Sequence, residues 1–360
     1  MRRYGVAVIG ATGTVGRRFV KLLEDHPWFY VAAVAASGRS AGKAYAEAVE
    51  GRWEYDSPAP ESVAGLTVLD AAADALKIAE SADFAFCAAE MASKDETRAF
   101  EDRFAKMELP IISNNSAHRL TGDVPMMIPE LNLSHAELIP FQRKRLGTRR
   151  GFIAVKPNCS IQSYVPALHP LRCFGVKSVI ACTYQAISGA GKSFATAPEI
   201  LDNVIPYIGG GEERKSEAEP LKIWGEIRGG EIAPASEPAI SSQCFRVAAL
   251  DGHMAAVYAS FREKPPISEI LELWREFKGD TEGMGLPSSP KRFLTYFEEQ
   301  DRPQTRLDRD IEGGMGIALG RLREDNIFDY KFACLSHNTV RGAAGGGVLT
   351  AEALCALGYI

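Results

Sequence analysis

One cysteine in the chain has a sequence context that would make its thiol a nucleophile. Cys159 lies in the run VKPNCS (155–160), which is typical of a strand end, a tight turn and the start of a helix. Pro157 cannot continue a strand ladder, and Asn158 and Ser160 are both good helix-capping residues. A thiol placed there faces unpaired backbone N–H groups and the positive end of a helix dipole, so we expect its pKa to lie below about 8.5. The alternative is an inert buried cysteine.

Three other residues are candidates to work with this thiol. Gln185 is predicted to end a strand directly before the flexible run ISGAG (187–191), whose N–H groups could approach a nicotinamide or an oxyanion. His253 is predicted at a strand start, where an imidazole can act as acid or base, although a satisfied structural histidine is the alternative. Arg246 lies on the preceding predicted strand. Two basic side chains so close together in an acidic protein indicate a negatively charged substrate.

A further cation follows another predicted strand end. The predicted strand 109–113 runs directly into NNSAHR (114–119). Ligands of parallel α/β sheets bind at the carboxyl ends of the strands. We therefore interpret Arg119 as an anion ligand and not as a solvated surface charge.

A glycine-rich turn near the start predicts a dinucleotide-binding site. Tyr4–Ile9 is a short apolar run typical of a buried parallel strand, GATGTVG (10–16) follows it, and helical periodicity runs through 17–25. Such a turn brings bare backbone N–H groups to a pyrophosphate at a helix N-terminus. The residues expected to bind the dinucleotide are Gly10, Thr12, Gly13, Thr14 and Val15.

The end of the second predicted strand, 30–36, indicates which dinucleotide binds. An NAD-selective domain usually places an Asp or Glu there to hold the ribose 2′-hydroxyl. This chain continues instead with SGRSAGK (37–43), which contains no carboxylate. Arg39 and Ser40, with Lys43, could hold a 2′-phosphate, which predicts NADP; the alternative is an ordinary basic surface loop.

The elements that must position these residues indicate two domains. Before Cys159, predicted strands alternate with predicted helices (strands 83–88, 109–113 and 151–155; helices 71–81 and 93–106), which is the doubly wound parallel pattern. After it, a helix at 267–278 and predicted strands joined mostly by short turns indicate a mixed sheet covered by helices on one face (strands 179–187, 243–250, 253–261, 316–322 and 329–336). We predict an α/β protein with a Rossmann-type NADP-binding domain, residues 1–158 completed by a C-terminal helix in 339–360. An α+β catalytic and dimerisation domain with a mixed sheet would span residues 159–338.

Composition limits the possible classes of protein. A length of 360 residues suits two domains of roughly 150–200 residues. The net charge of −5 argues against a nucleic-acid surface, and no apolar run is long enough to span a bilayer. Seven cysteines without regular spacing are typical of a reducing compartment and of a protein without a zinc site. We expect a cytoplasmic protein that binds neither a metal, nor nucleic acid, nor a membrane.

The motifs resemble those of the aspartate-β-semialdehyde dehydrogenase family, in the branch common in archaea and fungi. The resemblance covers nearly the whole chain and follows the family's order (GATGTVG, SGRSAGK, SNNSAHR, IPELN, KPNCS, YQAISGAG, EERKSEAE, CFRVAALDGH and HNTVRGAAGG). Members of this family use NADPH to reduce aspartyl-4-phosphate to aspartate semialdehyde and inorganic phosphate, in the biosynthesis of lysine, methionine, threonine and isoleucine. The resemblance also implies that the closing helix rejoins the first domain and that the second domain forms a homodimer or a dimer of dimers.

The resemblance implies a role for each candidate residue. Cys159 would be the nucleophile that forms a thioacyl intermediate, Gln185 would help to orient the acyl group, and His253 would be the acid/base. The substrate-binding residues would be Arg246 at the α-carboxylate, Glu212 with Lys215 at the amino end, and Arg119 and Asn158 with Lys215 at the phosphate. The residues at the nicotinamide half of the cofactor would be Ser188, Gly189 and Asn338. An acyl phosphate is already activated, so this chemistry needs a thiolate and a place for phosphate but no metal.

Two departures from the family pattern bear on substrate preference. Ile161 stands where the family usually has Thr, and KSFA (192–195) stands where relatives have an aromatic residue or Arg followed by Pro-Gly. The alternatives are a malonyl-CoA reductase or another acyl-phosphate or thioester reductase of the same superfamily. Among these, N-acetylglutamyl-phosphate reductase typically carries an Ala-Thr segment after its cysteine, which is absent here. A non-catalytic NADP-binding sensor is disfavoured because Cys159, Gln185 and His253 occur together with Arg246.

Overall fold

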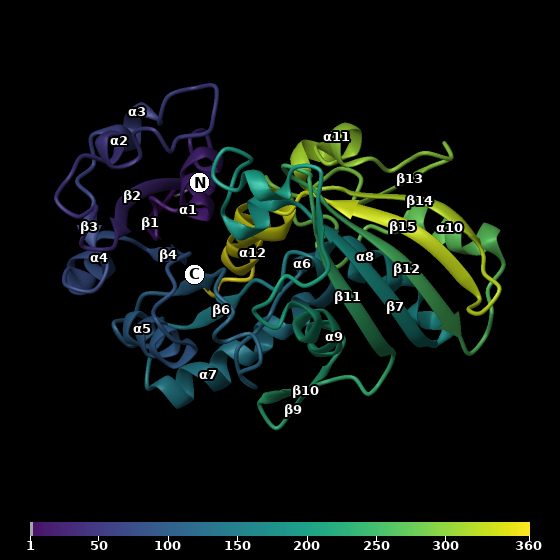
Figure 1. Cartoon of the computed structure of the whole chain (residues 1–360). Coiled ribbons are helices and arrows are strands. Elements are labelled where there is room, and N and C mark those ends of the chain that lie inside the picture. Colours follow the sequence, from purple (N-terminus) through teal and green to yellow (C-terminus); the bar gives the residue numbers. More distant parts are fainter. Residues whose placement is uncertain (1–2) are drawn as a thin grey trace.

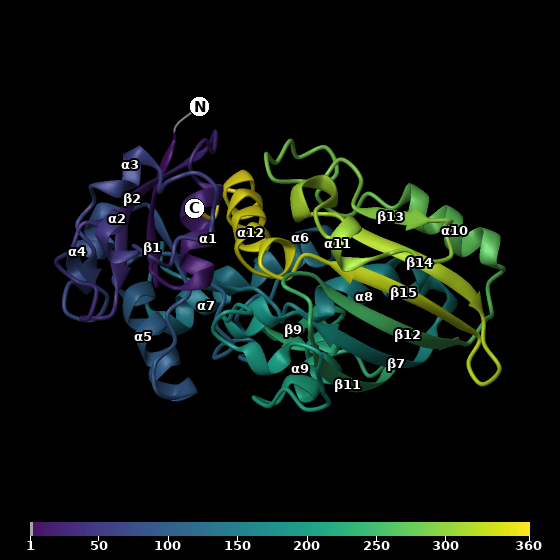
Figure 2. The ribbon, with the colours of Figure 1, turned by 45° about the horizontal axis from the view of Figure 1, so that its top comes forward.

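The computed structural model describes residues 3–360, so residues 1 and 2 of the predicted first domain lie outside it. Two main β-sheets lie side by side, and helix α12 (Gly345–Ala356, yellow) lies between them in both ribbon views (Figure 1, Figure 2). A separate two-stranded hairpin consists of β9 (Glu226–Arg228) and β10 (Glu231–Ala233). None of the helices within residues 3–360 has both the length and the apolar character needed to cross a membrane.

The first sheet has six parallel strands in the order β3-β2-β1-β4-β5-β6. Its strands are β1 (Tyr4–Ile9), β2 (Phe29–Ala36), β3 (Leu69–Asp70), β4 (Phe84–Cys87), β5 (Ile111–Ser113) and β6 (Ile153–Val155). The helices of this part are α1 (Thr14–Leu22), α2 (Tyr45–Ala48), α3 (Glu61–Ala64), α4 (Ala75–Ser81), α5 (Lys94–Lys106), α6 (Pro129–Asn132) and α7 (Ile139–Leu146). The order reverses between β1 and β4, which is the switch point where ligands of doubly wound sheets bind. The predicted Rossmann-type sheet is confirmed.

The second sheet is mixed, as predicted, and has the order β13-β14-β15-β12-β7-β11-β8. Its strands are β7 (Val176–Gln185), β8 (Val204–Ile205), β11 (Ala239–Val247), β12 (His253–Phe261), β13 (Leu294–Phe297), β14 (Ile317–Glu324) and β15 (Tyr330–Ser336). The helices of this part are α8 (Ile161–Leu168), α9 (Glu212–Ile223), α10 (Ile267–Glu276) and α11 (Thr305–Asp308). Helix α8 contacts β12, β14 and β15, and α9 contacts β11. Side chains along β12 alternate between buried and half-buried, so one face of the sheet forms a core and the other is open.

Several predicted boundaries are wrong by two to four residues. Strand β11 was expected at 243–250 and β7 at 179–187, but both begin and end earlier, and α1 begins at Thr14 and not at residue 17. The short strands β8 and β13 were not predicted. Both are at the edges of the second sheet, where a strand has one partner and little apolar signal.

Helix α12 completes the core of the first sheet. Residues 345–354 are all buried, and Val348, Ala351 and Leu354 pack in the same apolar cluster as Val6 and Phe19. The expectation that the closing helix rejoins the first sheet matches this packing. The domain boundaries at 158 and 339 stay a prediction.

Two buried polar contacts tie the same end of the chain to the first part. Glu352 Oε1 lies 2.7 Å from His26 Nε2. The Arg341 guanidinium donates to both carboxylate oxygens of Glu130, at 2.7 and 2.6 Å. Because these groups have little access to water, the contacts fix the orientation of the C-terminal segment against the first part of the chain.

Candidate active site

Cys159 lies in the turn between β6 and α8, at the junction of the two sheets. Strand β6 belongs to the first sheet, whereas α8 packs on the second, so the turn connects the two halves of the molecule. Asn158 Oδ1 accepts hydrogen bonds from the backbone N–H and the hydroxyl of Ser160, at 2.8 and 2.6 Å. The predicted strand, turn and helix are therefore present; the Asn158 side chain closes the turn, while Ser160, at the N-cap of α8, makes no side-chain capping bond.

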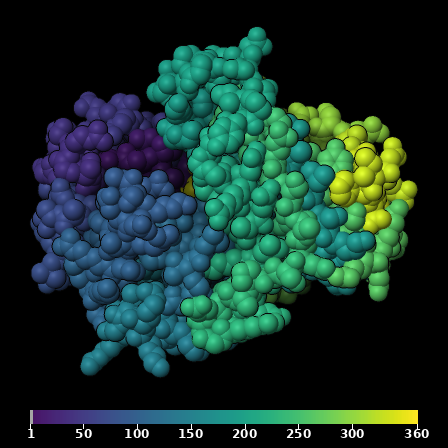
Figure 3. Space-filling view, turned by 60° about the horizontal axis from the view of Figure 1, so that its bottom comes forward, coloured from purple at the N-terminus to yellow at the C-terminus, as the bar shows by residue number. Residues whose placement is uncertain are grey.

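A cavity of about 560 Å³ brings most of the candidate residues together with the thiol. We call it the cysteine cavity. Its lining includes Arg119, Asn158, Cys159, Gln185, Ser188, Gly189, Glu212, Lys215, Arg246 and Asn338. These residues come from loops and elements of both halves. Figure 3 shows the purple and blue first part meeting the teal and green second part along a seam, with a little of the yellow C-terminal segment visible between them.

Gln185 and Arg246 are neighbours across parallel strands. They are paired in register at the ends of β7 and β11, so both side chains lie at the same end of the second sheet. Arg246 Nη1 donates to the carbonyl of Ala186 at 2.7 Å, and Gln185 Nε2 donates to Thr183 Oγ1 at 3.2 Å. Burial lowers the pKa of Arg246, but its guanidinium stays charged at neutral pH. A fixed cation is thus placed on the wall of the cysteine cavity.

His253 lies directly behind this wall. A Cβ on Gly189 would fall 2.9 Å from His253 Nε2 and 3.1 Å from Arg246 Nη1, so a glycine is needed for the loop to lie against both side chains. The backbone N–H of Ala186 donates to His253 Nδ1 at 3.0 Å, which leaves the proton of the neutral ring on Nε2. Nε2 is buried and has no hydrogen-bond partner among residues 3–360. Burial, followed by the nearby Arg246 charge, lowers the pKa of His253 to about 3. The imidazole is therefore a neutral donor at pH 7.

The expected lowering of the Cys159 pKa is wrong for the free protein. Burial raises the pKa of the thiol to about 11, and the negative charge of Glu212 raises it further. The cations Arg119, Lys156 and Arg246 act in the opposite direction without outweighing the loss of water. The local argument from a helix dipole omitted this desolvation, which depends on residues distant in the sequence.

Glu212 begins α9 and is already engaged on both oxygens. Oε1 accepts from Asn158 Nδ2 at 2.9 Å, and Oε2 accepts from Lys215 Nζ at 3.2 Å. Burial raises the pKa of this carboxyl, but the charge of Lys215 and the hydrogen bonds from Asn158 and Lys215 together lower it below its ordinary value. Glu212 is therefore an ionised carboxylate beside the cysteine. The helix that it begins is partly buried, with Ser216, Glu219 and Lys222 among its buried residues.

A second carboxylate of α9 was missed from the sequence. Glu219 is buried; its Oε1 lies 3.1 Å from Arg119 Nη1, and its Oε2 accepts from the backbone N–H of Asn158 at 2.6 Å. Arg119 also donates to the carbonyl of Asn114 at 3.1 Å. Glu219 thus fixes the predicted anion ligand and the residue before the nucleophile at the same time.

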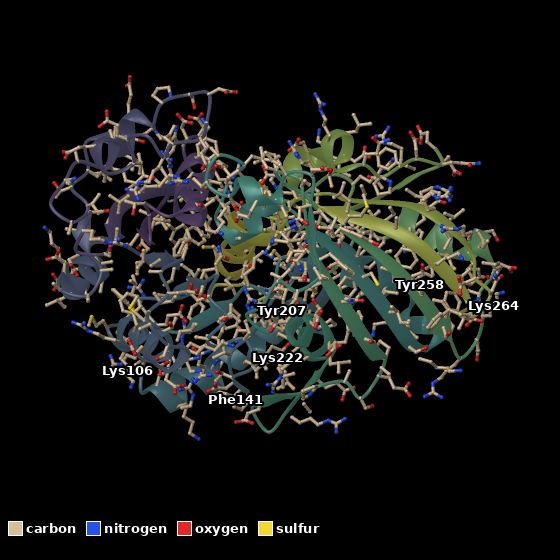
Figure 4. The ribbon with its side chains drawn as sticks, viewed as in Figure 1. Lys106, Phe141, Tyr207, Lys222, Tyr258 and Lys264 are labelled. Atoms are coloured by element: carbon tan, nitrogen blue, oxygen red, sulfur yellow. The ribbon has the colours of Figure 1, made fainter. Side chains whose placement is uncertain are left out.

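Lys222 continues the same helix face toward the Arg119 loop. Its ammonium donates to the carbonyls of Arg119, Thr121 and Val124, at 2.8, 2.6 and 2.9 Å. Figure 4 labels Lys222 near the centre of the molecule, beside α9. Glu212, Lys215, Glu219 and Lys222 are three or four residues apart, which places them on one face of a helix. That spacing was visible in the sequence, but nothing in it indicated what the face would meet.

The glycine-rich turn has the shape that a dinucleotide requires. Gly10 has φ +87°, and a Cβ there would lie 2.7 Å from the carbonyl carbon of Ala88. A Cβ on Gly16 would lie 2.1 Å from the Gly10 oxygen, so α1 can approach the turn this closely only with glycine at both positions. Thr12, Gly13 and Thr14 line a cavity of about 880 Å³, the glycine-turn cavity, and Val15 lines the cysteine cavity. Gly10 lines neither of these two cavities, and its positive φ sets the shape of the turn.

A continuous path joins these cavities to the loop 37–43, which was predicted to hold the 2′-phosphate of NADP. Ser188 and Thr339 line both the cysteine cavity and the glycine-turn cavity. Thr12 also lines a third cavity of about 530 Å³, together with Arg39, Ser40 and Lys43. The residues present therefore fit an extended dinucleotide along these adjoining cavities.

The loop after Gln185 does not offer the free N–H groups that the sequence led us to expect. The N–H groups of Ser188 and Gly189 donate to the carbonyls of Leu250 and Ala186, at 3.2 and 3.1 Å. The loop is held instead by Asn338, whose Nδ2 donates to Ser188 Oγ at 2.8 Å and whose Oδ1 accepts from Gly252 N–H at 2.8 Å. Asn338 therefore connects the loop to the start of β12, beside His253.

Neither of the two departures from the family pattern lines the cysteine cavity. The side chain of Ile161 is fully buried in the apolar core. Lys192, Ser193 and Ala195 line the glycine-turn cavity, and Phe194 packs on a small cluster around Ile187. Within residues 3–360, no three His, Cys, Asp or Glu side chains come together in an arrangement that could hold a metal ion.

Comparison with known proteins gives consistent results for both halves. Residues 5–139 match the family model described as "Semialdehyde dehydrogenase, NAD binding domain", and residues 168–341 match "Semialdehyde dehydrogenase, dimerisation domain". The chain is 40% identical over 362 residues to an aspartate-semialdehyde dehydrogenase of Aspergillus fumigatus, covering 98% of this chain and 97% of the relative. It is 41% identical over 350 residues to that of Methanothermobacter thermautotrophicus, covering 96% and 97%. The crystal structure of aspartate semialdehyde dehydrogenase with NADP from Candida albicans superposes with a TM-score of 0.88 at 36% identity, over 99% of this chain and 100% of that one.

Proposed function

Because the chain belongs to the aspartate-semialdehyde dehydrogenase family, we propose that it catalyses the NADPH-dependent reductive dephosphorylation of L-aspartyl-4-phosphate to L-aspartate 4-semialdehyde and inorganic phosphate. The observation that carries this proposal is a single cavity that holds Cys159, Gln185, Arg246 and Glu212 and continues to the glycine-rich turn.

In the first chemical step, Cys159 attacks the acyl carbon of the substrate. The sulfur–carbon bond forms, the bond from carbon to the phosphate oxygen breaks, and phosphate leaves with the electron pair and takes up the thiol proton, so the enzyme retains a thioester. Bound NADPH would supply a hydride to the thioester carbonyl, after which the carbon–sulfur bond breaks, the electron pair returns to the Cys159 sulfur and the aldehyde is released. The Nε2–H of His253 is a neutral donor without a protein partner, which suits it to protonate or hydrogen-bond an oxygen or sulfur that gains negative charge. Gln185, buried beside it, would orient the acyl group.

The charges of the cavity match those of the substrate. Arg246 would pair with the α-carboxylate, and Glu212 would accept the α-ammonium group, sharing its oxygens with Lys215. Arg119, Asn158 and Lys215 would bind the phosphate. The cofactor would lie along Thr12–Val15, with Ser188, Gly189 and Asn338 at its nicotinamide half and Arg39 and Ser40 at its 2′-phosphate.

The test is phosphate-dependent reduction of NADP with aspartate semialdehyde, followed by nicotinamide absorbance. We expect turnover that requires both inorganic phosphate and the aldehyde. A requirement for coenzyme A in place of phosphate, with malonyl-CoA as the faster substrate in the reductive direction, would identify the chain as the alternative reductase. No turnover under either condition would favour the non-catalytic sensor.

We also propose that the chain forms a homodimer through the open face of the second sheet. The family's dimerisation domain covers this sheet. Tyr184 is 38% exposed on the face of the sheet away from the helices, and the centre of its ring stacks 5.9 Å from that of Phe245. Tyr258 of the neighbouring strand β12 lies on the same face of the sheet as Tyr184 (Figure 4). Sedimentation analysis should give a dimer or a dimer of dimers, and Tyr184→Asp should shift it to monomer.

A cytoplasmic location is the remaining part of the proposal. All seven cysteines of the chain are free thiols, which persist in a reducing compartment. Cell fractionation with thiol labelling would test it, and recovery of the native protein with oxidised cysteines from an oxidising compartment would contradict it.

A further inference from the structure

A fourth cavity lies beside the cysteine cavity and is strongly basic. It has a volume of about 250 Å³, and we call it the basic cavity. Its charged lining residues are Lys94, Arg98, Arg119, Arg214 and Lys215, with Glu219 as the single acid. Both oxygens of Glu219 are already bound, one to Arg119 and the other to the Asn158 N–H. Three of the five cations are paired with carboxylates, namely Arg119 with Glu219, Arg98 with Asp95 and Lys215 with Glu212. The positive charges of Lys94 and Arg214 remain, and they favour an anionic ligand.

The basic cavity and the cysteine cavity share part of their walls. Ser116, Arg119, Gly210 and Lys215 line both. At Gly210 and Gly211 the wall is bare backbone with φ of +61° and +68°, which glycine adopts without strain. The basic cavity shares no lining residue with the glycine-turn cavity or with the cavity around Arg39. The basic cavity therefore adjoins the cysteine cavity but neither of the other two cavities along the path of the dinucleotide.

Arg119 is a fixed cation at this boundary. The residue is only 9% exposed, and its two terminal nitrogens are engaged by Glu219 and by the Asn114 carbonyl. Its Nε is buried and has no partner among residues 3–360. Because Glu219 and the Asn114 carbonyl hold its terminal nitrogens, Arg119 is a fixed cation in the wall that the two cavities share, and its charge favours an anion on either side.

Two further cations at the outer side of the basic cavity are not committed to ion pairs. Lys94 at the start of α5 and Arg214 in the first turn of α9 are exposed, and neither forms an ion pair within the described part of the chain. Arg98 is different, because its Nε donates to the Ala117 carbonyl at 2.9 Å and its guanidinium pairs with Asp95. Lys94 and Arg214 are therefore the side chains best able to take up a phosphate from solvent.

We propose that the basic cavity is a second phosphate subsite, through which inorganic phosphate leaves and enters the cysteine cavity. This inference rests on the proposed function. Arg119 and Lys215 face both cavities, so a phosphate dianion can move from one to the other without losing contact with both cations at once. The glycine-turn cavity adjoins the cysteine cavity at Ser188 and Thr339, which belong to the path of the dinucleotide, whereas the basic cavity adjoins it at Arg119 and Lys215. Phosphate can thus exchange while the cofactor is bound.

The test removes the two outer cations and leaves the thiol site intact. The variants are Lys94→Ala, Arg214→Ala and their combination. The control is Lys106→Ala, because Lys106 is an exposed lysine at the other end of α5, the helix that begins with Lys94, and lies away from the seam between the two halves (Figure 4). In the direction that consumes phosphate, KM for phosphate should rise about threefold in each single variant and about tenfold in the combination. KM for aspartate semialdehyde and for NADP should not change, and neither should kcat. The difference between variant and wild type should shrink at high salt.

A second measurement does not depend on turnover. Equilibrium dialysis of the NADP-bound protein against radiolabelled inorganic phosphate should show weaker binding in the combined variant than in the Lys106→Ala control. Equal phosphate KM and equal phosphate binding in all four variants would overturn the inference, while leaving the proposed function standing if the wild type turns over. A wild type without phosphate-dependent turnover overturns the proposed function instead, and the dialysis result then decides the subsite alone.

Discussion

Replacing Glu219 by glutamine tests whether one buried carboxylate holds the Arg119 side chain and the turn before Cys159 together. In Glu219→Gln the side chain keeps its length, and its amide oxygen can still accept from the Asn158 N–H, which the carboxylate accepts at 2.6 Å. The amide cannot replace the negative charge 3.1 Å from Arg119 Nη1. The Arg119 guanidinium is then a buried cation without a counter-ion.

The expected loss in the free energy of unfolding depends on how well Arg119 stays solvated without the Glu219 charge. Removing one partner of a buried ion pair typically costs about 3–5 kcal/mol, because the other charge is left uncompensated. Arg119 keeps its bond to the Asn114 carbonyl and lines two cavities, so part of its solvation is retained. We therefore expect Glu219→Gln to lower the free energy of unfolding by about 2–3 kcal/mol. KM for phosphate should also rise, because Arg119 is no longer held in place.

The assay is a double-mutant cycle by equilibrium urea unfolding, with wild type, Glu219→Gln, Arg119→Met and the combination. Because Met leaves no charge to be stranded, the two substitutions should be coupled by at least about 1.5 kcal/mol. Glu217→Gln is the matched control, since Glu217 lies on the same helix and accepts one backbone hydrogen bond, from Ser242 at 3.1 Å, without a cation. Additivity of the cycle to within about 0.5 kcal/mol, or an equal loss in the control, would refute the reasoning.

The thiol, the substrate carboxylate, the nucleotide loop and the buried imidazole each give a further test. The alkylation rate of Cys159, taken as the difference from Cys159→Ala, should still be rising at about pH 9, because burial raises the thiol pKa to about 11; a plateau below about pH 8 would contradict this. Glu212→Gln should cut activity with aspartate semialdehyde severely, at a cost of roughly 2–5 kcal/mol, yet hardly affect an analogue without the amino group. Arg39→Ala should weaken NADP about tenfold to a hundredfold and NAD little, measured by cofactor titration; equal losses would make Arg39 merely structural. His253 has a folded pKa of about 3, below its ordinary 6.5, so its contribution to stability is present above pH 6.5 and is lost as the pH falls toward 3. In His253→Asn, the slope of the unfolding free energy against pH between pH 3 and 6.5 should fall by up to about 1.4 kcal/mol per pH unit. An unchanged slope would count against a neutral buried ring.

The features that the sequence predicted well depend on neighbouring residues. The Asn158 turn, the glycine turn with Gly10 and Gly16, and five of the six strands of the first sheet are encoded within short stretches, where turn chemistry and periodicity dominate. The sixth, the two-residue strand β3, was not predicted. The family resemblance then placed distant residues in one site, and the cysteine cavity indeed contains Arg246 and Glu212.

The features that were missed or wrong depend on tertiary burial. The pKa of Cys159 follows from desolvation and from Glu212 on a distant helix, and a local dipole argument includes neither. Glu219 and Lys222 looked like ordinary polar residues of α9, because only the assembled fold shows that this face meets the Arg119 loop. Strand edges shifted for a related reason, since pairing with a neighbouring strand, and not composition, decides where β7 and β11 end.

The position of α12 has a consequence for how the protein is made. The core of the first sheet needs Val348, Ala351 and Leu354, but these residues are synthesised about 190 residues after β6, the last strand of that sheet. At ribosomal rates of about 5–20 residues per second, the sheet waits roughly 10–40 s with an apolar face uncovered. The nucleotide-binding half therefore cannot mature before the other half, although it emerges first. A nascent chain stalled before residue 345 should be protease-sensitive and chaperone-bound in its N-terminal half, and should become resistant only when α12 leaves the ribosome.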